Sequence, residues 1–427
     1  MSFLGMGFAL RDKRPPKFEK MECRQMQEKG KFAKGFFTGV AVTLVIVLSV
    51  WSVKSLLFEL LPGLGNMNTS AVQDRETVNR KLGQIQELID DYYLYGDEID
   101  EDALIEGIYS GYASGLGDPY TEYYDAQEAK ELMATTSGEF FGIGATMMQD
   151  PQTYAVEVVS VYQDSPAQEA GLEAGDVIYQ VDDHVVTDES LDEVVSWIKG
   201  DEGTEVVLHV RRDGEELELT AVRGKIEVQT VEYEMKEEQI GYIAVSEFDD
   251  VTYKQFQTAL EDLEEQGMKG LVIDLRNNPG GNLDTVTDML KLILPEGTIV
   301  STKDKYGDES TIKCDGKHEF TKPLALLVNQ YSASASEIFA GAVQDYGVGE
   351  IVGETTYGKG VVQQIIDLQD GTYLKLTVAE YYTPSGRSIN GTGVKPDVEV
   401  EYEPDVDDPN ADNQLERAME VVEEKLD

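Results

Sequence analysis

Residues 270–281 read GLVIDLRNNPGG, an apolar, strand-like run that ends in a turn of asparagine, proline and glycine. The chain also predicts a strand at 240–248 and helices at 252–266 and 283–294. A further strand at 324–329 is again followed by a helical pattern. Strands that alternate with helices in this way form a mostly parallel sheet with helices on its faces. These residues therefore predict an α/β domain.

The region before this domain is rich in strand-like runs. These runs, separated by turn residues, occupy 154–161, 177–181, 205–211 and 216–222. One amphipathic helix interrupts them, with Leu191, Val194, Val195 and Ile198 on one face, and Ser190 and Glu193 are spaced as a capping box before it. We assign residues 139–228 to a β-rich domain.

Helical patterns stand at both ends of these two domains. Apolar residues recur at helical spacing over 78–92 and over 104–112. They predict a small helical module at 71–138, whose expected role is packing or dimerisation. The chain closes with an acidic tail at 401–427, in which Leu415, Met419 and Val422 form one short helical pattern.

Length and charge limit the possible functions. At 427 residues the chain exceeds what one hydrophobic core usually organises, so two or three domains are expected. It carries 35 Lys and Arg against 82 Asp and Glu, a net charge of −47. Such a surface repels phosphate backbones and argues against a nucleic-acid partner. The basic residues are concentrated in the first 34 positions, where they outnumber the acidic ones.

An uncharged stretch at 35–53 reads GFFTGVAVTLVIVLSVWSV and is long enough to cross a bilayer core. We predict an uncleaved signal anchor at 35–57, with the basic segment 1–34 in the cytoplasm and the catalytic domain outside it. A buried core helix is one alternative. A cleaved signal peptide is another, although no A-x-A site follows. Cys23 and Cys314 then lie on opposite sides of the membrane and cannot pair within one chain.

A serine nucleophile is the chemistry that these residues favour. The chain has only three histidines, of which two fall in the β-rich domain, so a Ser-His-Asp triad is hard to build. A lysine whose pKa is lowered by burial can replace histidine as the base. Residues 331–337 read YSASASE and open a helix after a strand, which makes Ser334 a candidate nucleophile. Ser334 and Glu337 also fit a simple capping box, and this feature alone favours the cap.

Two other segments provide the remaining parts of such a site. Lys359 stands between Gly358 and Gly360 and is followed by Gln363, although the lysine alone is typical of an exposed turn. The strand end at 277–281 offers Gly280 or Gly281 as one donor of an oxyanion hole, with the Ala335 N–H as the other.

At these residues the chain resembles the carboxyl-terminal processing, or tail-specific, serine proteases. That family has the motifs D-L-R-x-N-x-G-G, S-A-S-x-E-I and G-K-G-x-x-Q. This chain has DLRNNPGG at 274–281, SASEI at 334–338 and GKGVVQ at 358–363. The match spans roughly residues 75–400 and includes LGDPY at 116–120.

The resemblance implies a role for each matching residue. Ser334 would be the nucleophile, Lys359 the general base and Gln363 the side chain that orients the lysine, while Gly280 or Gly281 with Ala335 would form the oxyanion hole. Ser332 and Ser336 would only shape the turn. The β-rich domain would be a PDZ domain whose loop Gly142, Ile143 and Gly144 binds the substrate's terminal carboxylate.

The expected protein is thus a multidomain α+β, membrane-anchored endopeptidase with a ClpP/crotonase-like protease core at 229–400. It would recognise protein C-termini and would need neither a metal nor another cofactor. A homodimer is conceivable, because related enzymes dimerise through helical segments. The main alternative is a catalytically silent, membrane-tethered PDZ scaffold.

Three motif near-matches favour other classes only weakly. Residues 353–360 lack the hydroxyl of a Walker A loop. Residues 405–416 lack the glycine of a calcium loop, so we interpret them as a solvated acidic tail. His318-Glu319 lacks the second histidine of a zinc protease motif.

Overall fold

The computed structural model describes residues 69–187, 189–404, 408 and 411–426, which divide into two compact units between Ile99 and Asp100. The first unit contains the helix α2 (Thr69–Tyr92) and a short 3-10 helix, Gly96–Glu98. The predicted anchor at 35–57 lies outside the described residues. Within the described ranges, none of the helices has the length and apolar character needed to span a membrane.

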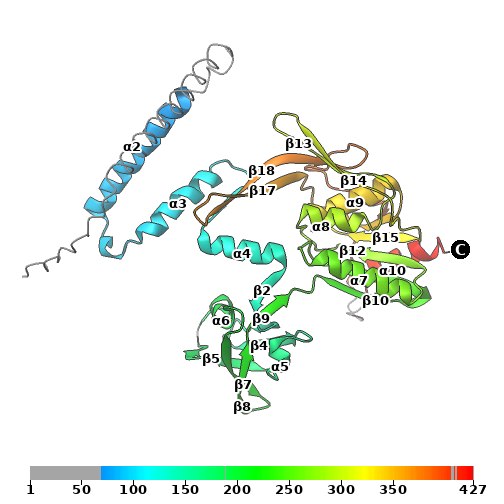
Figure 1. Cartoon of the computed structure of the whole chain (residues 1–427), viewed down its shortest axis with the longest axis horizontal. Helices are drawn as coiled ribbons and strands as arrows, with labels where there is room; N and C mark the ends of the chain where they lie inside the picture. Colours follow the sequence, from blue (N-terminus) through cyan, green and yellow to red (C-terminus); the bar gives the residue numbers. More distant parts are fainter. Residues whose placement is uncertain (1–68, 188, 405–407, 409–410, 427) are drawn as a thin grey trace, which may run out of the picture. The chain divides into compact units, whose positions relative to one another are not determined.

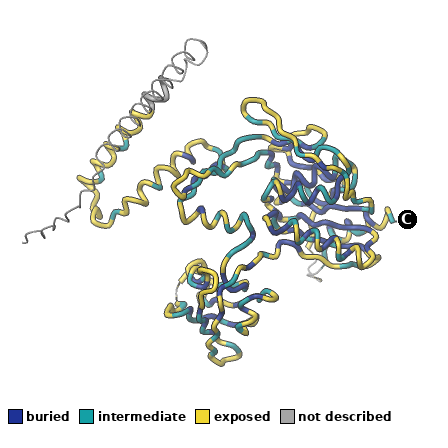
Figure 2. Tube along the Cα trace, viewed as in Figure 1, coloured by how far each residue is buried: buried dark blue, intermediate teal, exposed yellow. Residues whose placement is uncertain are grey.

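The second unit begins with α3 (Glu101–Ser114), β1 (Glu122–Tyr124) and α4 (Ala126–Ser137). Asp125 and Glu128 form a capping box at the start of α4, and Gly138 ends this helix in the left-handed conformation. Most of α2 and α3 is exposed, as the yellow trace in Figure 2 shows. The predicted helical module is therefore helical, with one strand inserted.

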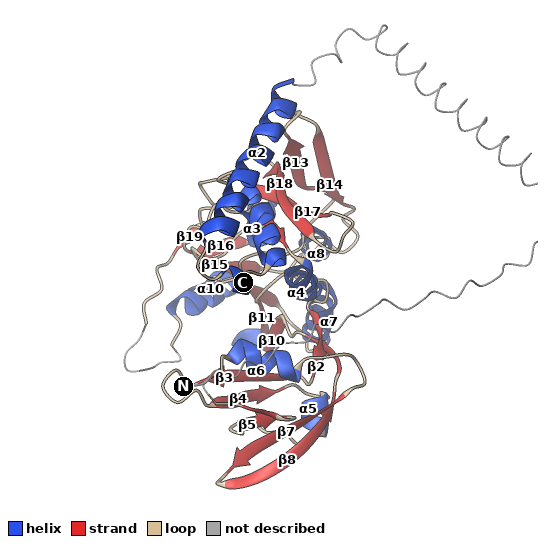
Figure 3. Ribbon diagram, turned by 90° about the vertical axis from the view of Figure 1, so that its left-hand side faces the viewer, coloured by secondary structure: helices blue, strands red, loops and turns tan. Residues whose placement is uncertain are grey.

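The β-rich region forms a sheet with the order β3-β4-β5-β7-β8, to which β6 adds at β5 (Figure 3). The strands are Ala145–Gln149, Val156–Val161, Val177–Val181, Glu205–Arg212 and Glu215–Val222, with β6 at His184–Val185. The helices α5 (Pro166–Glu169) and α6 (Leu191–Ile198) accompany this sheet. The four predicted strands and the predicted helix are confirmed, and Ser190 caps α6 through the Glu193 N–H.

A separate pair, β2 (Glu139–Gly142) and β9 (Gly224–Glu227), joins the beginning and end of this domain. The chain leaves α4 along β2 and returns along β9 to the α/β domain. The two connections are therefore hydrogen-bonded to each other as an antiparallel ladder.

The α/β domain has a six-stranded sheet of order β10-β11-β12-β15-β16-β19 (Figure 1). Its strands are Val231–Met235, Ile240–Val245, Gly270–Asp274, Leu324–Val328, Glu350–Gly353 and Val398–Glu399. All neighbours from β11 to β19 are parallel, and only β10 is antiparallel. The prediction of a mostly parallel sheet is confirmed.

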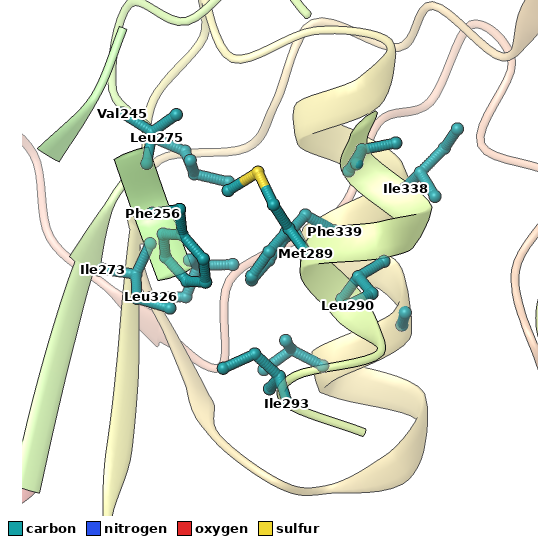
Figure 4. Packing of buried hydrophobic residues seen from close by; sticks show 14 of the residues in the cluster. Val245, Phe256, Ile273, Leu275, Met289, Leu290, Ile293, Leu326, Ile338 and Phe339 are labelled. Atoms are coloured by element: carbon teal, nitrogen blue, oxygen red, sulfur yellow. The ribbon is translucent and has the colours of Figure 1, made fainter. Parts of the chain in front are cut away.

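Successive residues of each strand point to opposite faces of this sheet, and both faces are covered. On one face the main core contains residues of α7 (Thr252–Glu265), α8 (Leu283–Leu290) and α9 (Ala335–Tyr346). Figure 4 shows Phe256, Met289 and Phe339 of these helices packed against Ile273 and Leu326 of the strands.

The other face is covered by α10 (Asn413–Glu423), whose Ala418, Val421 and Val422 are buried. The Arg276 guanidinium donates to Asp274 and Asp412, the residue that caps α10. The end of the acidic tail, expected to be solvated, is therefore part of the core. The acidic residues within α10, Glu416, Glu420 and Glu423, are exposed, so they lie on the outward face of an amphipathic helix.

A second sheet was not anticipated from the sequence. It is antiparallel and contains β13 (Gly297–Asp304), β14 (Glu309–Cys314), β17 (Val361–Asp367) and β18 (Tyr373–Tyr382). The strand β1 pairs with β18, with Tyr123 opposite Leu374. This pairing brings the segment around residues 116–124 to the same sheet as β17, which directly follows the candidate lysine.

Candidate active site

Ser334 lies between β15 and α9, and Ala335 is the first residue of α9. Its φ of 54° and ψ of −111° fall in a region that non-glycine residues rarely adopt. Such strain persists only where the surrounding structure imposes it, and it is concentrated at functional sites. The serine is half-buried, and the helix N-terminus beside it favours negative charge.

Gly280 is the glycine that touches this serine. A Cβ atom at Gly280 would lie 2.8 Å from the Ser334 Cβ and 3.0 Å from the Ala335 nitrogen, and the φ of Gly280 is 112°. Gly281 instead packs against the backbone of Phe248, where an added Cβ would lie 2.4 Å from the carbonyl oxygen. Both positions therefore exclude a side chain, but only Gly280 adjoins the nucleophile segment.

The N–H groups of this loop have different partners. The Gly280 N–H donates to the Asn278 Oδ1 at 2.9 Å. For the N–H groups of Gly281 and Ala335, no acceptor is found within the described part of the chain. In this structure the Gly280 donor is thus occupied, whereas the Ala335 donor remains open to an oxyanion.

Asn278, which the sequence reasoning did not single out, is completely buried and connects the strand ends. Its side chain donates to the Val245 carbonyl oxygen at 2.8 Å. Its own carbonyl oxygen accepts from the Ala333 N–H and the Ser336 hydroxyl, each at 3.0 Å. The asparagine therefore holds the glycine turn against the nucleophile segment. Its place in the quoted motif D-L-R-x-N-x-G-G was the signal that could have identified it.

Glu337 joins the nucleophile segment to the lysine segment. One carboxylate oxygen, Oε2, accepts from the Ser334 N–H at 2.9 Å and from the Lys359 N–H at 2.8 Å. The other, Oε1, accepts from the Gly358 N–H at 2.7 Å and the Thr356 hydroxyl at 2.5 Å. Glu337 is fully buried, which raises its pKa, while these hydrogen bonds act in the opposite direction.

This arrangement changes the interpretation of two patterns. The predicted capping contact from Glu337 to the Ser334 N–H forms, but the same carboxylate also captures the loop that carries the lysine. The Walker-like loop at 353–360 directs its Gly358 and Lys359 N–H groups to this carboxylate. Those donors are therefore not available to a phosphate.

Tyr381 of β18 adds a second link between the two segments. Its hydroxyl lies within hydrogen-bonding distance of the carbonyl oxygens of Lys359 and of Ser334, the latter at 3.0 Å. The ring is almost completely buried, and burial raises the pKa of the phenol well above its usual value. No local pattern singles out this residue, because it is one of 22 tyrosines and has no distinctive neighbourhood.

The ammonium group of Lys359 lies 4.6 Å from the ring centroid of Tyr120. Burial holds the pKa of Lys359 below its usual value, and the positive charge of Lys375 lowers it further. Asp118 and Glu337 act in the opposite direction. Lys359 is thus a half-buried lysine rather than the exposed turn residue that its glycine neighbours suggested.

Tyr120 and Asp118 belong to the segment LGDPY, so the predicted role of the helical module was too narrow. Packing or dimerisation does not account for an aromatic ring beside the lysine. Asp118 is held by the Thr121 hydroxyl at 2.6 Å and the Tyr120 N–H at 3.1 Å. The segment reaches the lysine because β1 pairs with β18, a long-range contact that local patterns do not reveal.

Gln363 lies on β17, opposite Thr377 of β18. Its amide nitrogen donates to the Thr377 hydroxyl at 3.1 Å. Thr377 was not singled out from the sequence. Its N–H donates at 3.2 Å to the hydroxyl of Thr121, which itself donates to Asp118. The role of Gln363 in orienting the lysine stays a prediction.

No group of side chains suited to hold a metal ion occurs among the residues that the structure describes. Asp405 and Asp407 of the calcium-like pattern lie outside them.

The loop at 142–144 of the β-rich domain forms one side of a small groove. The carbonyl oxygens of Ile143 and Gly144 accept from the N–H groups of Ala167 and Tyr162, at 2.8 and 3.0 Å. Gly144 has a φ of 79°, and an added Cβ would lie 2.6 Å from the Ser165 Cβ. A cavity of about 110 Å³ separates this loop from α6.

Comparisons with known proteins agree with this architecture. The sequence pattern of peptidase family S41 matches residues 239–400, that of a PDZ domain matches 157–212, and that of the activating protease CtpB N-terminal domain matches 63–128.

Two similar proteins are each described as a probable CtpA-like serine protease. The one from Staphylococcus epidermidis is 36% identical over 318 residues, which are 74% of this chain and 64% of that protein. The one from Staphylococcus aureus is 35% identical over 370 residues, which are 86% of this chain and 72% of that protein. The chain thus spans less than two thirds of the first relative's length.

A solved structure of a photosystem II D1 C-terminal processing protease is 32% identical, with a TM-score of 0.43, and the match covers 70% of this chain and 82% of that one. The sequence relatives and the matched patterns establish that the chain belongs to peptidase family S41, among the CtpA-like serine proteases that carry a PDZ domain.

Proposed function

We propose that this chain is a serine endopeptidase that cleaves proteins near or from their C-termini, with Ser334 as nucleophile and Lys359 as general base. The observation that carries the proposal is the shared carboxylate oxygen of Glu337, which accepts from the backbone N–H groups of both residues. The segments that carry Ser334 and Lys359 are separate in the sequence. Their shared contact with Glu337 holds them side by side, as a nucleophile and its base require.

In the first half of the reaction, the Ser334 Oγ attacks the carbonyl carbon of the substrate and its proton passes to the neutral amine of Lys359. The carbonyl electrons move onto oxygen, where the open Ala335 N–H and the helix N-terminus stabilise the negative charge. When the carbonyl re-forms, the C–N bond breaks and the lysine returns its proton to the departing amine. An ester between Ser334 and the substrate remains.

In the second half, a water molecule attacks the ester carbon and gives its proton to Lys359. The C–O bond to Ser334 breaks, the serine recovers the proton, and the substrate leaves with a new carboxylic acid. A second oxyanion donor is proposed at Gly280 or Gly281. Gly280 adjoins Ser334 and Ala335, but its N–H would have to leave Asn278 before it could bind an oxyanion.

The substrate class follows from the PDZ domain. We propose that the groove at Gly142–Gly144 captures the C-terminal carboxylate of a protein or peptide, with the open N–H groups of the loop as donors. The α/β domain is proposed to be of the ClpP/crotonase type, with its parallel sheet and helical layers in support. The uncharged stretch at 35–53 and its basic flank support a single-pass anchor at 35–57 with the catalytic domain outside the cytoplasm.

The catalytic proposal is tested by measuring cleavage of an unstructured protein and labelling by a fluorophosphonate. The wild type and Ser332→Ala are expected to cleave and to be labelled, whereas Ser334→Ala does neither. A wild type that binds peptide tails but is neither labelled nor cleaves would identify the protein as the catalytically silent scaffold instead.

The topology is tested on intact cells with an added protease. Removal of the PDZ and α/β domains, with protection of residues 1–34, is expected. Protection of these domains together with digestion of residues 1–34 would reverse the proposed orientation.

A further inference from the structure

The backbone groups of Ser334 and Lys359 are held by the same two side chains. The N–H groups of both residues donate to one carboxylate oxygen of Glu337, at 2.9 and 2.8 Å. Their carbonyl oxygens both lie within hydrogen-bonding distance of the Tyr381 hydroxyl. Glu337 thus binds the backbone donors of the two residues, and Tyr381 faces the backbone acceptors of the same two residues.

Tyr381 projects from a strand that is paired on both edges. It lies near the end of β18, where it pairs with Thr302 of β13, while the neighbouring Glu380 pairs with Val361 of β17. Its ring belongs to the main hydrophobic core and is 1% exposed. A side chain on such a strand is held more firmly than one on a loop. The hydroxyl therefore has a fixed place between the two segments.

The phenol of Tyr381 has one proton for two carbonyl oxygens, so the two acceptors share it. Burial raises the pKa of this phenol well above its usual value, and the negative charge of Glu337 acts in the same direction. The hydroxyl therefore remains a donor throughout the pH range in which the lysine would act.

The two carbonyl oxygens depend on this proton to different degrees. The Ser334 carbonyl oxygen also accepts from the first turn of α9, through the N–H groups of Glu337 at 2.9 Å and Ile338 at 3.0 Å. For the Lys359 carbonyl oxygen, the described residues provide no donor other than the Tyr381 hydroxyl. Removing the hydroxyl therefore leaves the backbone of the nucleophile in place but deprives the base of a backbone partner.

The peptide unit between Lys359 and Gly360 has a weak partner on its other side. Its N–H group donates to the Asn390 Oδ1 only at 3.4 Å, near the upper limit for a hydrogen bond. The next carbonyl oxygen, that of Gly360, accepts from the backbone N–H of Tyr381 at 3.1 Å. Tyr381 thus holds two consecutive carbonyl groups of the lysine loop, one through its backbone and one through its hydroxyl.

We propose that Tyr381 is a positioning residue for the general base: its hydroxyl holds the Lys359 peptide group so that the amine stays buried and within reach of the Ser334 hydroxyl. The inference rests on the proposed Ser334–Lys359 mechanism and adds a residue that acts through the lysine. A shift of a reacting group by about 1 Å costs about a hundredfold in rate. Because burial holds the pKa of Lys359 below its usual value, a loosened loop also lets that pKa rise.

The test compares Tyr381→Phe with Tyr382→Phe in the full chain, purified in detergent. Both changes remove one hydroxyl and keep the ring, but Tyr382 is partly exposed and its hydroxyl donates to the Glu380 carboxylate at 2.9 Å. Initial rates on an unstructured protein give kcat and KM at several pH values. Thermal unfolding, and the anisotropy of a fluorescent peptide tail, show whether each variant folds and binds.

We expect Tyr381→Phe to lower kcat about a hundredfold and to leave KM within about twofold of the wild type, because the hydroxyl acts on the chemical step. The rise of its cleavage rate with pH should move to higher pH by about one unit, since less burial brings the pKa of Lys359 closer to its ordinary value. Tyr382→Phe should match the wild type in kcat, KM and pH profile.

A Tyr381→Phe variant with an unchanged kcat, or with an unchanged pH profile, would overturn this assignment. A Tyr381→Phe variant that does not fold would do so as well, because the hydroxyl would then serve stability rather than the position of the base. Failure of the underlying mechanism is distinguishable from either result, since it would appear as cleavage by Lys359→Ala.

Discussion

Most polar groups around Ser334 are buried and paired with one another, apart from the N–H groups of Gly281 and Ala335, whereas the N–H groups of Ile143 and Gly144 have no acceptor in the described part of the chain. Four donors converge on the Glu337 carboxylate. The Asn278 side chain similarly accepts a hydrogen bond from the Gly280 N–H. In the PDZ groove, two loop N–H groups and Lys199 have no acidic or carbonyl partner within the described residues. The first region thus satisfies most of its polar groups within the chain, whereas the second leaves donors without a partner among the described residues.

This difference predicts how the two regions respond to substitution. Changes near Ser334 should affect the chemical step and often stability, because each buried polar group supports several others. Changes in the groove should affect the binding of substrate tails and leave the reactivity of the serine unchanged.

The largest effect is expected for the nucleophile and its base. Ser334→Ala and Lys359→Ala should each abolish cleavage almost completely, because the two residues act as a unit. Lys359→Arg should fail as well, since a guanidinium stays protonated. Initial rates on an unstructured protein would show this, with thermal unfolding to confirm that the variants fold. An active Lys359→Ala enzyme would contradict the assignment.

Two glycines provide a matched pair for the comparison, since both have positive φ and neither has room for a Cβ. Gly280→Ala should abolish fluorophosphonate labelling but keep the binding of peptide tails. Gly144→Ala should abolish the binding of peptide tails but keep fluorophosphonate labelling. Measuring labelling and anisotropy on both variants separates the two sites, and equal loss of both properties in either variant would show that the regions are not independent.

Glu337→Gln keeps the shape of the side chain but replaces one acceptor oxygen with an NH₂ group that faces N–H donors. We expect a loss of about 3 kcal/mol in the free energy of unfolding, together with much slower cleavage. Denaturant unfolding and initial rates measure the two effects. Glu265→Gln, at an exposed position of α7, is the control and should change neither. A stable, fully active Glu337→Gln protein would refute the linking role.

The pH dependence should report on the surroundings of Lys359. Since the lysine must be neutral to act as base, cleavage should rise with pH through its lowered pKa. Tyr120 favours the protonated form by about 0.5–2 kcal/mol through its ring, so Tyr120→Leu should move this rise to lower pH, by less than about 1.5 pH units. Rates at several pH values test this, with Tyr306→Leu as an exposed control. If the rise in cleavage rate of Tyr120→Leu moved to higher pH instead, the proposed effect of the ring on Lys359 would be contradicted.

The smallest effects should come from the flanking serines. The Ser332 hydroxyl donates to the Leu275 carbonyl oxygen at 2.7 Å, and that of Ser336 donates to the Asn278 carbonyl oxygen. Removing either should cost about 1 kcal/mol of unfolding free energy and leave most of the activity. Thermal denaturation and initial rates suffice, and a Ser332→Ala variant without activity would contradict the assignment of Ser334.

Much of the fold could be read from local patterns. The strand at 270–274 and the helix at 252–265 were predicted because hydrophobic periodicity and turn residues act over a few positions. The antiparallel sheet of β13, β14, β17 and β18 was missed, because its exposed residues alternate weakly with half-buried ones.

The candidate site divides in the same way. Ser334, Lys359 and Gly280 belong to short motifs whose residue types indicate their chemistry. Tyr120 and Asn278 also stand in matched segments, but their residue types do not indicate a role, and Tyr381 stands in none of these segments. The importance of all three comes from what touches them. Glu337 stands between these cases: its spacing from Ser334 predicted a helix cap, but its contacts with Gly358 and Lys359 depend on a loop 21 and 22 residues away.

The sequence alone determined most helices and strands of the α/β and β-rich domains, the negative charge of the chain and the residues able to act as nucleophile and base. These properties depend on residue type and on spacing within one element, which local physics governs. The tertiary structure alone decided which glycine meets Ser334, how Glu337 and Tyr381 join the serine to the lysine, and that Tyr120 reaches the base. Those contacts join segments far apart along the chain, and they form only when the strands pair and the polar groups between them must be buried together.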